Sequence, residues 1–188
     1  AGMLKSKGYD TCMIGKWHLG WNWPRKAGKD KTKRLAWSSV DFTKRIPGGP
    51  VDRGFDSYFG DDVPNWPPFT WFENDKIVIQ PTAMMKKGAM VGVSNGPAAP
   101  DWKFDVVLPT YVKRIQTYLA GRKNNPKPFF LYFPMPSPHT PIAPSKQFRG
   151  ASGVNPYVDF LMETDWAIGE TLKALEAAGK KDNTIVIF

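Results

Sequence analysis

One lysine and two histidines are the residues in this sequence whose types and placement best suit acid–base chemistry. Lys16 and His18 lie in the segment Gly15-Lys16-Trp17-His18-Leu19-Gly20, directly after a short apolar run, and the second histidine, His139, lies in the proline-bounded segment 136–141. A lysine ammonium is a compact charge that suits a tetrahedral oxyanion, and an imidazole gains or loses a proton near pH 7. The pattern indicates a site that binds an anionic group and transfers a proton.

This combination fits the cleavage of an ester of a strong oxyacid. Such a reaction needs its charged oxygens stabilised and its leaving alkoxide protonated, and Lys16, His18 and His139 together would meet both needs. Each residue alone also has a structural interpretation, because loop histidines are often hydrogen-bonded within the fold and lysines usually lie on the surface.

The elements that must position these residues follow an alternating order. The sequence predicts a helix that ends near Gly8, a strand over 9–15, a helix over 109–121, a strand over 129–133, a helix over 156–178 and a strand over 184–188. This alternation predicts an α/β fold with a mainly parallel sheet flanked by helices. Because the carboxyl ends of parallel strands lie at one edge of a sheet, the loops that carry Lys16, His18 and His139 should converge.

Three details of this prediction can be checked directly. The strand over 129–133 is apolar on both faces, which is typical of a central strand. The helix over 156–178 should bury one face, marked by Val158, Leu161, Met162, Ile168, Leu172 and Leu175. Residues 21–100 look irregular and rich in Pro, Gly and Trp, with a single strand candidate at 76–79.

Composition bounds the class of protein. A chain of 188 residues with 41% hydrophobic residues fits one domain with a real core. Its apolar runs are too short to span a membrane, its single cysteine excludes an internal disulfide, and no zinc-type Cys/His spacing occurs. The beginning and the end of the sequence look cut inside a helix and a strand, so we expect an internal piece of a larger domain.

The net charge of +9 is unevenly distributed. Residues 1–53 hold 12 of the 26 Lys and Arg residues but only 4 of the 17 Asp and Glu residues, and many of the cations lie in the run 25–34. This run is either a solvated surface loop or a patch that attracts a polyanion. Nucleic acid is the weaker partner, because no recognition helix or RNA-binding motif accompanies the run.

Several segments resemble the sulfatase family of the alkaline-phosphatase superfamily. Residues 8–20 are similar to its second signature, G-Y-x-T-x-x-x-G-K-W-H-L-G, and residues 52–60 are similar to its D-R-G-F-D-x-x-x-G segment. The segments 128–141, 164–169 and 182–188 resemble its strand and histidine loop, its later helix and the strand that leads to its Asp-Asn metal segment. The resemblance covers nearly the whole chain and implies that residues 1–188 are the central part of one alkaline-phosphatase-like catalytic domain, incomplete at both ends.

The resemblance implies a sulfuric ester hydrolase and assigns roles residue by residue. Lys16 would bind a sulfate oxygen and the oxygen of the nucleophile, and His18 would hydrogen-bond the nucleophile. His139 would contact the sulfate ester and protonate the leaving alcohol. The family nucleophile is a formylglycine made in the motif C/S-x-P-x-R by a formylglycine-generating enzyme. That motif is absent here, and Cys12 stands at a variable position of the signature as a small buried residue.

The resemblance also implies calcium, held by two pairs of residues that lie outside this chain, so no metal ligand is expected within it. The chain alone should therefore be inactive. The substrate would be a sulfated small molecule, glycan or lipid, and location in the periplasm or outside the cell is implied by the resemblance only.

A polar and aromatic segment over 60–68 is a candidate substrate subsite. Its residues Asp61, Asp62, Asn65 and Trp66 combine carboxylates and an aromatic ring, which suit a sugar or an aryl group. A packed proline-rich surface loop is the alternative, and one acidic pair is weak support for a cation.

Two other functions remain open from the sequence. A phosphodiesterase or phosphonate hydrolase of the same superfamily would use a bare Thr or Ser nucleophile in the upstream segment. A non-catalytic polyanion-binding module would use the basic run 25–34, and its binding to sulfated glycans would depend strongly on salt.

Overall fold

A mixed sheet forms the centre of the computed structural model, which describes residues 1–29 and 35–188. Among these residues five strands pair in the order β4-β3-β2-β1-β7. Their bounds are Asp10–Ile14 for β1, Ser57–Gly60 for β2, Phe72–Glu73 for β3, Lys76–Ile77 for β4 and Phe129–Tyr132 for β7. A separate hairpin pairs β5 (Ala83–Met85) with β6 (Gly96–Ala98).

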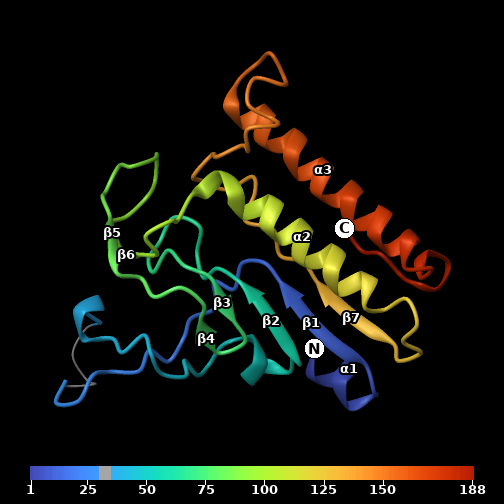
Figure 1. The fold of residues 1–188 in the computed structure, drawn as a ribbon, viewed down its shortest axis with the longest axis horizontal. Coiled ribbons are helices and arrows are strands. Elements are labelled where there is room, and N and C mark those ends of the chain that lie inside the picture. The colour runs from blue at the N-terminus through green and yellow to red at the C-terminus, as the bar shows by residue number, and fades with distance from the viewer. Residues whose placement is uncertain (30–34) are drawn as a thin grey trace.

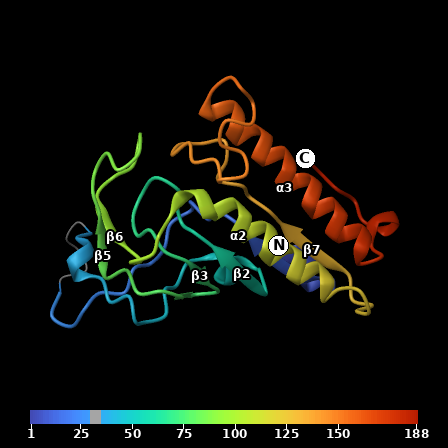
Figure 2. The ribbon, with the colours of Figure 1, turned by 45° about the horizontal axis from the view of Figure 1, so that its top comes forward.

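The described helices are α1 (Gly2–Ser6), α2 (Val107–Ala120) and α3 (Pro156–Ala177). Single 3-10 turns occur at Trp37–Ser39, Pro50–Arg53, Phe104–Val106 and Lys181–Asn183. Figures 1 and 2 show α2 lying across one face of the sheet, with α3 beside α2. A mainly parallel sheet with helices packed on it confirms the predicted α/β class.

The alternation of side chains along β1 divides the core into two layers. Cys12 and Ile14 face α2 and pack with Tyr111 and Ile115 of that helix. Met13 points to the opposite face. The residues that cover this second face come mainly from irregular segments and pack with Met13: Trp17, Trp21, Ile46, Phe55, Tyr58 and Phe72. The Trp-rich region therefore takes the place that a helix layer would occupy on that face.

β1 is parallel to both of its neighbours. Cys12 pairs with Ser57 of β2 on one side and with Leu131 of β7 on the other. The arrows of the three strands point the same way in Figure 1. The carboxyl ends of β2, β1 and β7 consequently lie side by side, which confirms the expected convergence of the loops after β1 and β7.

The description of residues 21–100 as irregular was incomplete. It missed β2, β3, β5 and β6, of which β2 pairs with β1 along residues 57–59. Four residues that end in glycine give too short a pattern to identify a strand, and pairing with β1 supplies the backbone hydrogen bonds that stabilise it. The candidate at 76–79 is confirmed as the two-residue strand β4, which pairs with β3.

Two strand predictions near the end of the chain were wrong in detail. β7 was expected to be a central strand, but it lies at an edge of the described sheet, beside β1. Residues 184–188 form no strand, and Ile187 and Phe188 are 90% and 95% exposed. An apolar run adopts a strand only where a neighbouring strand accepts its hydrogen bonds, and none of the described strands pairs with this run.

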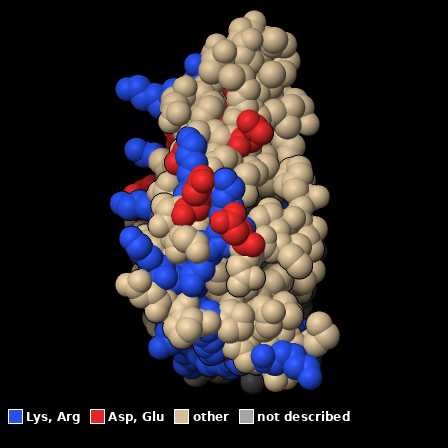
Figure 3. All heavy atoms as spheres, turned by 90° about the vertical axis from the view of Figure 1, so that its right-hand side faces the viewer, with Lys and Arg blue, Asp and Glu red and all other residues tan. Residues whose placement is uncertain are grey.

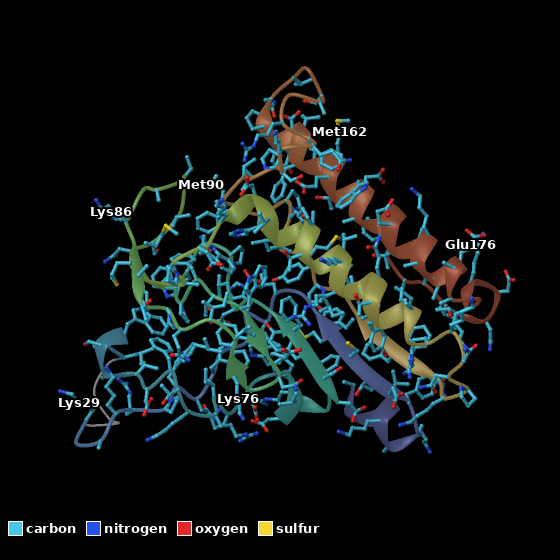
Figure 4. The ribbon with its side chains drawn as sticks, in the orientation of Figure 1. Lys29, Lys76, Lys86, Met90, Met162 and Glu176 are labelled. Carbon is cyan, nitrogen blue, oxygen red and sulfur yellow. The ribbon has the colours of Figure 1, made fainter. Side chains whose placement is uncertain are left out.

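The helix predicted over 156–178 is confirmed as α3, whose first turn is capped by Asn155 Oδ1 accepting from the Val158 amide at 3.0 Å. Its predicted buried face was partly wrong. Leu161, Met162 and Leu172 are exposed, and Figure 4 shows Met162 on the side of α3 away from α2. The buried positions are Asp159, Phe160, Glu163, Thr164, Ala167 and Leu175.

Candidate active site

The loop after β1 is fixed on both sides by the loops that follow its neighbouring strands. Four successive amides of this loop donate to backbone carbonyls: Gly15 to Phe59 at 3.0 Å, Lys16 to Pro134 at 2.9 Å, Trp17 to Asp61 at 3.0 Å and His18 to Asp62 at 3.0 Å. Three polypeptide segments that are distant in sequence are thereby joined at one edge of the sheet.

Glycine is required where these backbones approach one another. Gly15 has φ +142°, and a Cβ added there would lie 2.3 Å from the carbonyl oxygen of Pro134. A Cβ added at Gly60 would lie 1.8 Å from the carbonyl oxygen of Gly15. Both distances are far inside van der Waals contact. The glycines therefore allow Lys16 to sit directly between the ends of β2 and β7.

Lys16, His18 and His139 share one electrostatic environment. His18 is in the left-handed region with φ +60°, and its side chain is exposed. The pKa of His18 is lowered by partial burial and then by the positive charges of Lys16 and His139. This electrostatic effect agrees with the junction of the Lys16 loop and the segment after β7, where the Lys16 amide donates to the Pro134 carbonyl oxygen.

The ring of His139 is oriented by its own loop. Its Nδ1 lies 2.7 Å from the carbonyl oxygen of Thr140. A carbonyl oxygen can only accept, so Nδ1–H donates and Nε2 remains available for a substrate. The His139 amide donates to the Pro136 carbonyl oxygen at 3.1 Å, which closes the turn. A proton taken up on Nε2 gives the imidazolium form, in which both ring nitrogens are donors and Nε2 can release its proton to a leaving group.

Comparison with known proteins connects this arrangement to one family. A sequence model of the family described as Sulfatase matches residues 1–188, the whole chain. The chain belongs to the sulfatase family. The prediction made from the two signature segments is thereby confirmed.

The similar relatives of this sulfatase-family chain have named activities. An N-acetylgalactosamine-6-O-sulfatase of Bacteroides thetaiotaomicron is 27% identical over 219 residues, which cover 100% of this chain and 41% of the relative. Human N-acetylgalactosamine-6-sulfatase is 27% identical, and the match covers 99% of this chain and 30% of the relative. Human arylsulfatase A is also 27% identical, and the match covers 100% of this chain and 34% of the relative. The chain thus spans less than half the length of these relatives.

Solved structures support the fold. A structure from work on glycosaminoglycan metabolism by Bacteroides thetaiotaomicron aligns with a TM-score of 0.75 at 23% identity, over 97% of this chain and 42% of that one. A PsFucS1 sulfatase from Pseudoalteromonas aligns with a TM-score of 0.63 at 18% identity, over 97% of this chain and 35% of that one. At these identities the likeness shows a shared architecture, and it confirms the expected alkaline-phosphatase-like sheet.

Two members of the candidate subsite over 60–68 are buried beside the Lys16 loop. Asp61 Oδ1 accepts from the Tyr111 hydroxyl at 2.5 Å, and the Asp61 carbonyl oxygen accepts from the Tyr58 hydroxyl at 2.8 Å. Burial raises the pKa of Asp61 to about 6 and the pKa of Asp62 to about 7. Asp61 Oδ2 and Asp62 Oδ1 have no hydrogen-bond partner among the described residues. The two aspartates therefore lie in the protein interior and support the loop that carries Lys16.

Asn65 and Trp66 are placed differently from the two aspartates. Trp66 is 55% exposed, and Asn65 Nδ2 donates to the Gly92 carbonyl oxygen at 3.3 Å. A Cβ added at Gly92 would lie 3.2 Å from Thr140 Oγ1, beside His139. The segment of Asn65 and Trp66 therefore reaches the His139 loop, and both residues remain candidates for substrate contact.

Cys12 is confirmed as a small buried residue. It lies in the core below α2 with 4% of its surface exposed, and burial raises the pKa of its thiol. A thiol that resists ionisation is a poor nucleophile. Cys12 thus supports the sheet and is not the reactive group.

Sequence reasoning missed the tyrosines that hold the site together. Tyr58 and Tyr111 are buried, come from β2 and α2, and direct their hydroxyls to Asp61. The signal was present for Tyr111, because it lies four residues before Ile115 on the apolar face of α2. A hydroxyl on such a face needs a polar partner, which only the folded chain identifies.

The raised pKa values of the two aspartates predict a stability that falls as the pH rises. The ordinary pKa is 3.8, so between about pH 4 and 7 the folded protein retains protons that the unfolded chain releases. The ionised carboxylates then cost folding free energy above pH 7. We expect Asp62→Asn to raise the free energy of unfolding by about 2 kcal/mol at pH 8, with little gain at pH 4.5, measured by urea denaturation.

The exposed Asp101→Asn is the matched control for this experiment, since Asp101 lies in water. We expect it to change the free energy of unfolding by less than about 0.5 kcal/mol at either pH. A gain from Asp62→Asn that is equal at both pH values would contradict the assigned burial effect.

Proposed function

We propose that residues 1–188 are the central part of a single catalytic domain that hydrolyses sulfuric esters. The observation that carries the proposal is the junction of the loops of Lys16, His18 and His139 at the ends of adjacent parallel strands, in a chain matched throughout by the sulfatase family. The aryl sulfate and sugar sulfate activities in the names of the relatives belong to the same reaction class.

Each of the three side chains has a role that its environment supports. The Lys16 ammonium binds an oxygen of the sulfate group as a point charge. The oxygen of the nucleophile forms a bond to sulfur as the S–O bond to the alcohol breaks. His139 in its imidazolium form donates the Nε2 proton to the ester oxygen, so that the alcohol leaves neutral and His139 is left as a neutral ring. His18, whose pKa is lowered by partial burial and by its cationic neighbours, is largely neutral at pH 7 and accepts a proton from the nucleophile's hydroxyl.

The nucleophile in this proposal is a formylglycine in a segment outside residues 1–188, made by a formylglycine-generating enzyme. Cys12 is buried and is followed by Met13-Ile14-Gly15-Lys16 in place of the required motif. The chain by itself is therefore inactive, and all tests of activity use the full reading frame that encodes it.

Calcium is proposed for the complete protein, with ligands outside this chain. Across the residues that the structure describes, no three His, Cys, Asp or Glu side chains form a group suited to a metal ion. Asp61 and Asp62 also fit poorly, because Tyr111 already occupies one oxygen of Asp61 and burial keeps both carboxyls partly protonated. No step of the mechanism above is assigned to the metal.

A sulfated glycan is the proposed substrate class. Two of the relatives described above act, by their names, on N-acetylgalactosamine 6-sulfate groups. We also propose a location in the periplasm or outside the cell. In residues 1–29 and 35–188, no helix combines the length and apolar character that a bilayer-spanning segment requires.

The test is sulfate release by the full-length protein, co-expressed with a formylglycine-generating enzyme. The panel contains 4-nitrophenyl sulfate, N-acetylgalactosamine 6-sulfate, a sulfated lipid and bis(4-nitrophenyl) phosphate. We expect turnover of the sulfate esters, and at least a hundredfold loss when Lys16 is changed to alanine, because one preorganised charge contributes about that factor. Hydrolysis of the phosphate diester without sulfate release would favour the phosphodiesterase alternative.

The polyanion-binding alternative depends on the basic run 25–34, of which residues 30–34 lie outside the described residues. Elsewhere the positive charge is spread out. Figure 3 shows Lys and Arg side chains over the end of the molecule that lies at the right of Figure 1, interspersed with Asp and Glu. Lys173 pairs there with Glu170, and Lys181 with Glu176. If the chain binds no heparin at low salt, this alternative is excluded.

A further inference from the structure

A cavity of about 480 Å³ lies beyond the His139 loop. Its apolar walls include Met90, Phe104, Ile142 and Pro144, and its polar groups include Asp105 and Arg149. The sequence signatures and the three site residues do not account for this cavity.

The cavity adjoins the place where His139 would meet a leaving group. Phe104 lines both this cavity and a smaller one that is also lined by His139 and Asp61. The chain runs directly from one cavity to the other, because Pro141 lines the smaller one and Ile142 lines the larger one. The His139 segment and the larger cavity therefore share the wall formed by Phe104 and residues 141–142.

The wall formed by Met90 is held in place by the loop between β5 and β6. Met90 and Phe104 pack against the same buried cluster, which contains Phe69. Figures 1 and 2 show this loop beside the beginning of α2, and Figure 4 labels Met90 on it. The contacts of Gly92 with Asn65 and Thr140 seat the same loop on the His139 segment.

The polar groups of the cavity offer one donor and one acceptor. Arg149 Nε donates to the Pro144 carbonyl oxygen at 3.2 Å, and Arg149 Nη2 pairs with Asp105 Oδ2. Arg149 Nη1 and Asp105 Oδ1 have no protein partner among the described residues. Asp159 also lines the cavity, but its oxygens already accept from the Gly150 and Ser152 amides.

This combination matches a neutral sugar. A pyranose ring has apolar C–H faces that pack on aromatic and aliphatic walls, and hydroxyls that both donate and accept. Because the Asp105 carboxylate neutralises the Arg149 guanidinium and Asp159 adds a negative charge, the cavity does not attract a second anionic group. The ring that fits is therefore uncharged.

We propose that this cavity is a subsite for a neutral sugar residue on the leaving-group side of His139, so that the substrate is a sulfated oligosaccharide. The inference rests on the proposed sulfatase function and adds to it the recognition of a second sugar residue. Arg149 and Asp105 fix the orientation of that sugar, and Phe104 and Ile142 pack on it.

The test compares two sulfate esters in the full-length protein. One is N-acetylgalactosamine 6-sulfate, and the other is a disaccharide that adds one neutral galactose to it. The double variant Arg149→Gln/Asp105→Asn keeps polar side chains at both positions but removes the charged hydrogen-bonding pair. We expect the ratio of kcat/KM for the disaccharide to kcat/KM for the monosaccharide to fall about tenfold, because two hydrogen bonds to hydroxyls are weakened.

A second variant and a control complete the experiment. Ile142→Trp fills the cavity from a half-buried position and should lower the same ratio by at least tenfold if the sugar needs that volume. Lys146→Ala removes a positive charge from the same loop, but Lys146 is exposed and does not line the cavity, so the ratio should stay within twofold of the parent. Thermal unfolding establishes that each variant is folded.

The outcomes separate this inference from the proposed function. An unchanged ratio in either folded variant would overturn the subsite and leave the sulfatase function in place. If the unmodified protein hydrolysed the monosaccharide but not the disaccharide, the subsite would also be overturned. If the parent released no sulfate from any ester, both the proposed function and the subsite would be overturned.

Discussion

Replacement of His139 by alanine in the full-length protein should lower kcat for a sugar sulfate by about 10²–10⁴-fold, the usual contribution of a general acid. The reason is that a sugar alkoxide is a poor leaving group and needs the proton on His139 Nε2. The loss for 4-nitrophenyl sulfate should stay below about tenfold, since nitrophenolate leaves without protonation. Steady-state kinetics with the two esters measure the difference.

His139→Gln is the matched variant for this prediction. It keeps a hydrogen-bonding side chain in the loop but cannot deliver a proton at neutral pH. We expect it to resemble His139→Ala in its preference for the nitrophenyl ester. Equal losses for both esters in both variants would show that His139 binds the sulfate group without acting as an acid.

Replacement of Gly60 by alanine should lower the free energy of unfolding by about 3 kcal/mol, in the upper range for overpacking. The added Cβ would lie 1.8 Å from the Gly15 carbonyl oxygen and 2.6 Å from the Tyr58 hydroxyl. Both groups belong to the junction between β1 and β2, so this junction would have to separate. Urea denaturation gives the stability.

Gly169→Ala is the control for the stability effect. Gly169 lies inside α3, and an added Cβ would meet no atom within 4 Å. We expect the free energy of unfolding of this variant to rise by about 1 kcal/mol, because alanine favours a helix over glycine by about that amount. If Gly60→Ala were as stable as the parent, the close approach of β1 and β2 would be wrong.

The same variant links the fold to the site. Gly60 precedes Asp61, whose carbonyl oxygen accepts from the Trp17 amide. Movement of Gly60 therefore displaces the loop of Lys16 and His18. We expect Gly60→Ala to reduce sulfate release at a temperature where circular dichroism still shows a folded protein.

The sequence predicted correctly those elements that a local pattern of residues determines, and it failed where pairing with a distant strand determines the element. The helix over 109–121 is α2, because Val112, Ile115 and Leu119 repeat at helical spacing and are buried. The strand over 9–15 was identifiable because its residues are buried on both faces. β2 was not identifiable, because its four residues become a strand through pairing with β1. For the same reason, residues 184–188 have a strand-like composition but form no strand.

The site shows the same division. Lys16, His18 and His139 were recognisable by residue type and by loops bounded with glycine or proline. Asp61 and Asp62 were recognised as polar residues, but their burial was not predicted, since it depends on α2 covering the end of β2. The cavity of Phe104 and Arg149 left no pattern in the sequence, because its walls come from segments as far apart as Met90 and Asp159.

The amino-acid sequence by itself determined the family and the α/β class, and it identified the three side chains that we propose for sulfate ester cleavage, because short signatures and local periodicity encode them. Only the tertiary structure decided that β1 lies between β2 and β7, that the two aspartates support the Lys16 loop from inside, and that a cavity extends past His139. These features arise from backbone pairing and packing between distant segments, and no local pattern of residues specifies which segments will meet.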